Sequence, residues 1–235
     1  MPNSELSIYA AYGPEWWSGR HRWLRTLQNL VPARLSHFTT IIGDWRGRSV
    51  LDLGCGGGFM SEALAQLGAE VTGIDPCEEV IAIAKDHAAA GALSIAYRVG
   101  AGERLPVTTA AFDCVVSADV LEHVDDLDRV LDEVARALKP QGLFLFDTVN
   151  RTRLAAFVYV TMGEGVLRVV PRGTHEPARF IKPAELSTKL AARGFKVGPM
   201  VGLGPVGLDR RLDVTFGRLP TLAISYMGHA RAPGG

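Results

Sequence analysis

The sequence predicts an α/β fold in which a mostly parallel β-sheet carries helices on both faces. Short apolar runs alternate with stretches of helical apolar spacing from Ser49 onward, which is typical of parallel strands joined by right-handed crossovers. The first apolar run leads directly into a glycine cluster, reading VLDLGCGGG at 50–58. The next run ends in Asp75, roughly twenty residues further on, where α/β nucleotide folds place an acid on a ribose.

The alternation of strands and helices is expected to continue to residue 149. Strands are predicted at 49–54, 70–75, 95–99, 112–119 and 143–149, and helices at 59–67, 78–90 and 127–138. Gly68, Gly91 and Pro140 supply the signals that end these helices. Ligands of such sheets bind at the carboxyl ends of the strands, where the sequence places Gly54, Asp75, Glu103, Asp119 and Asn150.

Residues 1–45 precede this alternation and are predicted to form a helical extension. Aromatic residues are dense here, namely Tyr9, Tyr12, Trp16, Trp17 and Trp23. They either pack on the main domain or close as a lid over the active site. Helical spacing over 24–42 is interrupted at Pro32, which predicts that a second helix starts there. Residues 46–235 are expected to form one domain.

The alternation breaks again after Asn150. The segment 151–173 is apolar and is flanked by arginines, so it is either a packed helical insertion or a surface that dips into a bilayer interface. A helix at 183–193, a strand at 195–201, a glycine-rich loop and a final strand at 221–231 are predicted to follow.

The composition is that of an ordinary globular protein. Lys plus Arg and Asp plus Glu both number 25, so net charge does not indicate a nucleic-acid-binding surface. Cys55, Cys77 and Cys114 lack metal-binding spacing and are expected to be reduced thiols. No apolar run approaches the ~18 residues of a membrane span, and no signal peptide opens the chain. The expected location is the cytoplasm, with peripheral contact to the inner face of the membrane.

Asp119, Glu122 and His123 form a second candidate site, at the end of the strand predicted at 112–119. One helical turn would place all three on one face. Two carboxylates and an imidazole can bind magnesium, manganese or another divalent ion. Alternatively, His123 is a general base that the acids orient, or the two acids only cap the following turn.

The glycine cluster does not match a dinucleotide fingerprint, because Phe59 stands where the last glycine of G-x-G-x-x-G would be. With Asp52 before it, the cluster reads D-x-G-x-G-x-G, which resembles the first motif of S-adenosylmethionine-dependent methyltransferases. The resemblance implies that the loop at Gly54 and Gly56 lies against the methionine moiety and that Asp75 binds the ribose hydroxyls. Asp52 and Glu103 are added to the expected cofactor contacts.

A longer series of motifs resembles the O-methyltransferases of ubiquinone biosynthesis. The shared motifs are EWW at 15–17, VPARL at 31–35, the glycine cluster, VTGID at 71–75, LEHV at 121–124, NR at 150–151, VPRGTHEPARFIKPAEL at 170–186 and SYMGHA at 225–230. Only 198–220 matches poorly. The resemblance implies a seven-stranded, Rossmann-like class I methyltransferase fold and S-adenosylmethionine as the methyl donor. The implied acceptors are polyprenylated catechols and hydroquinones.

The same resemblance implies specific site residues. Cofactor contacts fall on Arg34, Gly54, Asp75 and Ala118, and 151–173 matches a segment that meets the membrane. The acid–x–x–Glu–His cluster resembles a divalent-metal site, most simply for Mg²⁺, although Asp119 is shorter than the usual glutamate.

In the expected reaction, a phenolate oxygen attacks the methyl group of the sulfonium. A metal ion on Asp119, Glu122 and His123 would stabilise the phenolate, or His123 or His175 would remove the proton. His175 is equally compatible with a structural role, and the remaining histidines are expected to be structural. Two alternatives stay open: methylation of a soluble phenol of secondary metabolism, and a non-catalytic cofactor-binding scaffold of a quinone-assembly complex.

Overall fold

The computed structural model describes residues 10–167 and 170–234. Tyr9, in the aromatic N-terminal stretch, and residues 168–169 of the insertion lie outside the described residues. No helix within the described ranges is long and apolar enough to cross a membrane.

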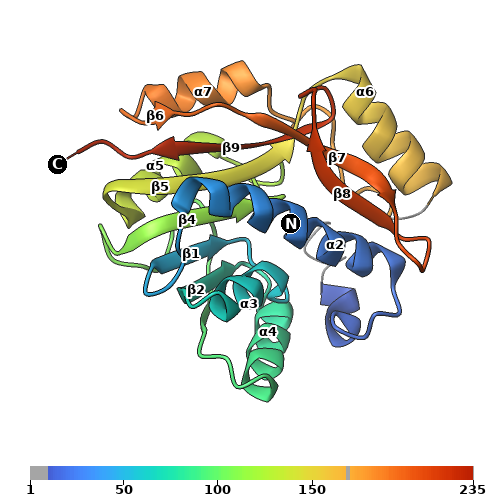
Figure 1. Ribbon diagram of the computed structural model, residues 1–235, viewed down its shortest axis with the longest axis horizontal. Helices are drawn as coiled ribbons and strands as arrows, with labels where there is room; N and C mark the ends of the chain where they lie inside the picture. The colour runs from blue at the N-terminus through green and yellow to red at the C-terminus, as the bar shows by residue number, and fades with distance from the viewer. Residues whose placement is uncertain (1–9, 168–169, 235) are drawn as a thin grey trace.

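A single twisted sheet forms the centre of the molecule (Figure 1). Its strands are β1 (Ser49–Leu53), β2 (Glu70–Asp75), β3 (Ala96–Val99), β4 (Phe112–Ala118), β5 (Leu138–Val149), β6 (Lys196–Val197), β7 (Val201–Leu208), β8 (Val214–Leu219) and β9 (Ser225–Arg231). The order is β3-β2-β1-β4-β5-β9-β7-β8, with β6 paired to β9. Strands β1 to β5 pair in parallel, as the alternating sequence predicted, and β9, β7 and β8 add antiparallel partners.

Helices cover both faces of the sheet. The helical segments are η1 (Gly13–Glu15), α2 (Arg22–Ile42), α3 (Phe59–Gln66), α4 (Glu78–Ala90), α5 (Leu127–Ala137), α6 (Arg153–Ala156), the π-helical η2 (Phe157–Val166) and α7 (Pro183–Ala191). On one face α5 and α7 pack on the aromatic pair Phe144 and Phe146 of β5. On the other face α2 and α3 bury Phe38 and Leu64 against Val116 of β4.

The predicted break of the N-terminal helix at Pro32 is wrong. Helix α2 runs without interruption through Pro32, whose ring faces solvent. Proline removes one backbone hydrogen bond from a helix interior. The apolar face on either side of it, including Leu30, Val31 and Phe38, is buried, and this packing outweighs the local penalty.

Two predictions for the C-terminal region are also wrong. The strand expected at 195–201 is only the short β6, and the glycine-rich loop expected after it is the β7–β8 hairpin. Glycines and Pro205 lower the strand propensity of this stretch. Pairing of β7 with β9 on one side and β8 on the other overrides that propensity, so the sheet has nine strands in the described residues rather than seven.

Candidate active site

A glycine turn at the carboxyl end of β1 forms the floor of the site. Gly54 has φ 70°, and a Cβ at this position would meet the side chain of Val120 at 2.3 Å. The amides of Gly54 and Cys55 donate to the carbonyl oxygen of Ile74 at 2.8 and 3.0 Å, which ties the turn to the end of β2. A side chain would strain this backbone and clash with Val120, so the sequence keeps a peptide surface without a side chain here.

Two acids predicted from the sequence, Asp52 and Asp75, accept hydrogen bonds at and beside the glycine turn. The Oγ of Ser61 donates to the buried carboxylate of Asp52 at 2.5 Å, and burial raises the pKa of Asp52 to about 6 despite that bond. Asp75 accepts from the amides of Gly56 at 3.0 Å and Cys77 at 2.9 Å, and burial raises its pKa as well. The acids therefore shape the turn before any ligand is bound.

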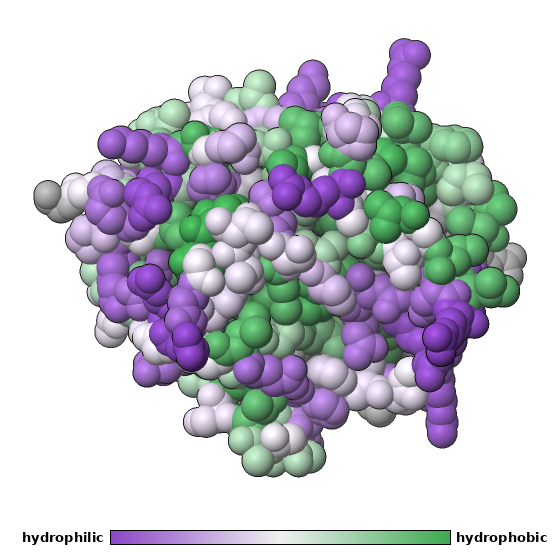
Figure 2. Space-filling model, viewed as in Figure 1, coloured by the Kyte–Doolittle hydropathy of each residue, from purple (hydrophilic) through white to green (hydrophobic). Residues whose placement is uncertain are grey.

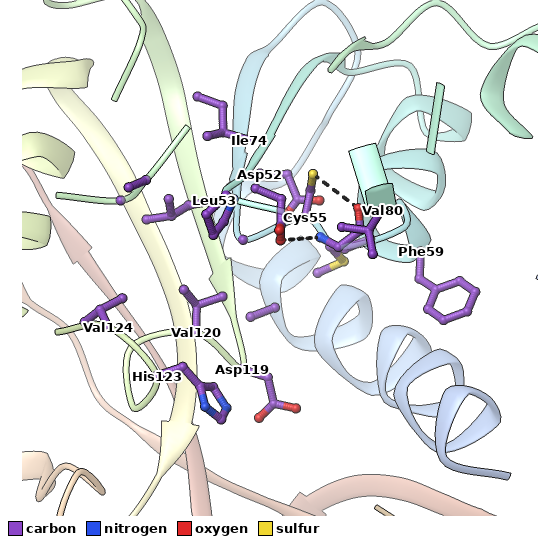
Figure 3. Close-up of a pocket in the computed structure, with 18 of the residues that line it drawn as sticks. Asp52, Leu53, Cys55, Phe59, Ile74, Val80, Asp119, Val120, His123 and Val124 are labelled. Atoms are coloured by element: carbon purple, nitrogen blue, oxygen red, sulfur yellow. Dashed lines mark hydrogen bonds between the residues drawn. The ribbon is translucent and has the colours of Figure 1, made fainter. Parts of the chain in front are cut away.

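The turn opens into a cavity of about 300 Å³ at the carboxyl edge of the parallel strands. Of the predicted cofactor contacts, all seven line it: Arg34, Asp52, Gly54, Gly56, Asp75, Glu103 and Ala118. In Figure 3 the side chains of Asp119 and His123 lie next to each other at one end of this pocket, away from Phe59. The predicted binding edge is thus one continuous cavity.

The N-terminal aromatics close one side of the cavity. Trp16 is buried against Gly56 and lines the pocket. The Nε1–H of Trp17 donates to the carbonyl oxygen of Gly57 at 2.8 Å. Its ring stacks on His87 with centroids 3.6 Å apart and planes at 4°. The extension is therefore attached to the glycine turn itself.

A buried arginine joins three elements at the pocket wall. Arg34 of α2 donates from Nη2 to Oδ2 of Asp147 at 2.8 Å, and the same nitrogen lies 3.2 Å from Oδ2 of Asp119. Burial raises the pKa of Asp147 to about 6, although Arg34 opposes that change. Asp147 was not predicted from the sequence, because it appears there only as one acid within the apolar run of β5.

The predicted metal site is not assembled in the structure. Within residues 10–167 and 170–234, no group of three or more His, Cys, Asp or Glu side chains is arranged to hold a metal ion. Asp119 adopts φ 60° and sends its carboxylate towards Arg34, so no helical turn spans 119–123. Glu122 is buried and accepts from Thr148 Oγ1 at 2.8 Å. The residues as arranged do not fit a metal ion, and the expectation of one shared face is wrong.

The pKa values of Asp119 and Glu122 are shifted in opposite directions. Burial raises the pKa of Glu122 to about 7, with the attraction of His123 only partly opposing it. For Asp119 the effect of burial is outweighed by Arg34 and the nearby histidines, so its pKa is lowered. Near pH 7 Glu122 is therefore about half protonated, whereas Asp119 is ionised.

His175 is held by a buried glutamate that the sequence analysis missed. Oε1 of Glu164 accepts from both the amide and Nδ1 of His175 at 2.9 Å, and Oε2 accepts from the amide of Gly173 at 2.7 Å. Burial pushes the pKa of Glu164 up, but these bonds outweigh it and the pKa lies below its usual value. The ring centroid of His175 is 5.8 Å from that of His123 and 4.8 Å from that of Tyr159. Glu164 is the only acid in the sequence of the apolar segment 151–173, and this isolation could have identified it as a candidate site residue.

Comparisons with known proteins are consistent with this geometry. A sequence model of the methyltransferase domain matches residues 51–146. The chain is 35% identical to the ubiquinone biosynthesis O-methyltransferase of Rhizobium etli, over 92% of this chain and 94% of the relative. It is 36% identical to that of Rhizobium rhizogenes, over 100% and 97%.

Solved structures share the fold. A magnesium protoporphyrin IX methyltransferase from Synechocystis with bound SAH aligns with a TM-score of 0.64 at 19% identity, covering 90% of this chain and 85% of that chain. A SAM-dependent methyltransferase from Thermotoga maritima, described as a possible histamine N-methyltransferase, aligns with a TM-score of 0.67 at 18% identity, covering 97% and 99%.

Proposed function

The chain belongs to the family of ubiquinone biosynthesis O-methyltransferases, and we propose that it methylates the phenolic hydroxyls of polyprenylated catechols and hydroquinones. It is an S-adenosylmethionine-dependent O-methyltransferase with a class I α/β fold. The observation that carries the proposal is the cavity in which the glycine turn meets Asp119 and His123. A donor bound on the turn would share this space with an acceptor.

The pocket residues divide into two groups by their chemistry. The bare turn at Gly54 and Gly56 and the carboxylate of Asp75 would hold the nucleoside part of S-adenosylmethionine. Arg34 is the cation at the wall and would attract the carboxylate of the methionine part, with Asp147 fixing the guanidinium. When bound, this cofactor supplies an activated methyl group. The chain then has to place the acceptor oxygen in line and remove its proton.

Proton removal is the chemical task left to the protein, because a phenol has a pKa near ~10. Two histidines are candidates: His123 lines the pocket, and His175 lies beside it with Nδ1 engaged by Glu164. A histidine whose Nδ1–H is bound by a carboxylate presents Nε2 as a proton acceptor. This arrangement favours His175 as the base, with His123 as a second polar contact to the acceptor.

A metal-assisted route would need a different arrangement of Asp119, Glu122 and His123 from the one described above. Arg34 engages Oδ2 of Asp119 and Thr148 engages Oε2 of Glu122, so the two acids would have to bring their other oxygens and His123 to one common point. Reaction rates in magnesium and in EDTA distinguish the two routes. A rate unchanged by EDTA supports the histidine route, whereas a rate that falls in EDTA and recovers with magnesium would show that the cluster rearranges around an ion.

Two further parts of the proposal concern access to the site. The N-terminal extension, predicted as residues 1–45, would act as a lid, since Trp16 and Trp17 already contact the glycine turn. The segment 151–173 would make peripheral contact with the inner face of the membrane, because Leu154, Phe157 and Val166 leave 47%, 52% and 63% of their surface exposed. A polyprenyl chain would then stay in the lipid while its head group enters the pocket.

The decisive experiment is methyl transfer to a short-chain catechol and to a demethylated quinol analogue, with product identified by mass. Turnover of both would establish two-step quinone methylation. Turnover of soluble phenols with neither quinone precursor would point to secondary metabolism. Cofactor binding in the absence of any turnover would point to a scaffold.

A further inference from the structure

The turn of the β7–β8 hairpin carries large apolar side chains that contact little else. Val206, Leu208 and Leu212 leave 57%, 61% and 68% of their surface exposed. The hairpin lies in the stretch of the chain that the family motifs do not cover. Water contact with such apolar surface costs about 25 cal/mol for each Å². A cluster of this kind at one turn is typical of a contact surface.

The turn is built to hold these side chains outward. Oδ1 of Asp209 accepts from the amides of Arg211 at 2.7 Å and Asp213 at 2.9 Å. Leu212 is held at φ 60°, a conformation that leucine rarely adopts. Arg25 of α2 clamps the base of the turn through bonds of 2.6 and 3.0 Å to the carboxylate of Asp213. The exposed leucines therefore sit on a fixed turn rather than on a loose loop.

The free charge at this turn is positive. The carboxylates of Asp209 and Asp213 are both engaged within the turn and with α2. The side chains of Arg210 and Arg211 are exposed, and neither makes a close ion pair among the residues that the structure describes, although Arg211 lies near enough to Asp213 to lower the pKa of that carboxyl. Arginine heads beside leucine side chains match a surface that is anionic outside and apolar beneath.

The hairpin turn lies at the same end of the molecule as the segment α6–η2. In Figure 1 the far end of the β7–β8 hairpin and the far end of the helix labelled α6 both lie on the right. Figure 2 shows hydrophobic surface along this side, bordered below by strongly hydrophilic side chains. Both elements also adjoin the site: β8 contacts α2, which carries Arg34, and Tyr159 of η2 contacts His175. One flat surface would therefore meet both elements at this end of the molecule.

We propose that the β7–β8 hairpin turn is an anchor for an anionic lipid bilayer, with Leu208 and Leu212 entering the interface and Arg210 and Arg211 binding lipid phosphates. This anchor is separate from the segment 151–173. The choice of a bilayer as partner rests on the proposed function, in which the acceptor carries a polyprenyl chain. The contact orients the molecule so that the pocket side faces the lipid.

The test is co-sedimentation of the full chain with vesicles of phosphatidylglycerol and phosphatidylcholine, compared with vesicles of phosphatidylcholine alone. The apolar variant is Leu208→Thr with Leu212→Asn; asparagine tolerates φ 60°, so the turn should still fold. The charge variant is Arg210→Gln with Arg211→Gln. Matched controls are Leu67→Asn, which replaces a leucine that is 42% exposed beyond α3, and Lys85→Gln with Arg104→Gln, two exposed cations elsewhere.

Loss of each arginine should weaken binding to anionic vesicles about fivefold, and therefore about 25-fold in the double charge variant, and high salt should remove this difference. The apolar pair should weaken binding at all salt concentrations, and the controls should bind as the unchanged chain does. The inference is overturned if the hairpin variants bind normally while Phe157→Ser does not. It is also overturned if the unchanged chain ignores anionic vesicles, or if the leucine changes only dissociate a self-associated form in light scattering.

Methyl transfer to a water-soluble catechol is followed on the same variants and should not change. A chain that methylates no phenol, yet loses vesicle binding in both hairpin variants, would refute the proposed function and support the anchor. A chain that methylates quinol analogues, with vesicle binding unaltered in every hairpin variant, would support the proposed function and refute the anchor.

Discussion

Replacing Glu164 with glutamine tests whether the glutamate positions His175 for catalysis. Glu164 accepts hydrogen bonds of 2.7, 2.9 and 2.9 Å, and glutamine can accept with only one of its two terminal atoms. At least one charge-assisted bond is lost, which is worth about 1.5–3 kcal/mol. If that bond fixes His175 in the transition state, kcat should fall about 10- to 150-fold. The affinity for S-adenosylmethionine should not change, because Glu164 does not line the cavity.

Steady-state kinetics with saturating cofactor give kcat, and calorimetry gives the affinity for the cofactor. The matched control is Glu176→Gln, which removes a neighbouring glutamate whose exposed side chain pairs only with Arg179 in the described residues. A melting temperature for each variant separates catalysis from folding. If Glu164→Gln folds normally and keeps the full kcat at every pH, Glu164 does not act through His175 and the assignment of the base is wrong.

Three other outcomes are expected. Burial, together with Arg218 and His229 nearby, lowers the pKa of His37 in the folded protein to about 4. In the unfolded chain the same imidazole binds its proton near pH ~6.5. The free energy of unfolding should therefore fall by about 3 kcal/mol as the pH falls from that value towards 4. Urea unfolding of His37→Phe should lack this component, and an identical pH dependence would contradict the burial argument. Trp16→Ala should raise the Kd for S-adenosylmethionine at least tenfold by opening one wall of the cavity, whereas an unchanged Kd would mean that the wall is not used. Pro32→Ala should raise the free energy of unfolding by about 1–3 kcal/mol, because it restores a helix hydrogen bond at an exposed position. A lower urea midpoint would show that the proline stabilises α2.

The parallel half of the sheet could be predicted because its signals are local. Strands β1, β2 and β4 are short, mostly apolar runs, and Gly54 and Asp75 mark the carboxyl ends of two of them. Six of the seven predicted cofactor contacts line one cavity for the same reason, since they lie at or beyond the carboxyl ends of parallel strands, which meet at one edge; the seventh, Arg34, comes from α2. Local patterns failed where packing decided the outcome, as at Pro32 and in the β7–β8 hairpin.

The pairings that tune the site could not be predicted from local patterns. Arg34 and Asp147 are 113 residues apart, and Glu164 lies in the apolar insertion rather than beside His175. The spacing of Asp119, Glu122 and His123 suggested one helical face, but the φ of Asp119 turns its carboxylate towards Arg34. The three groups still lie close enough to influence one another's charge, but they are not presented by one helical turn.

The bond between Arg25 and Asp213 has a consequence for how the protein is made. It joins residues 188 positions apart, and Asn29 of the same helix donates to the carbonyl oxygen of Val214 at 3.1 Å. During synthesis, α2 therefore lacks these partners until almost the whole chain has left the ribosome. Because α2 also carries Arg34, the pocket wall that this helix forms gains its last support only when the C-terminal hairpin exists. A nascent chain stalled short of residue 213 should leave the part of α2 that faces β8 uncovered, even though the strands that bear the glycine turn are already complete.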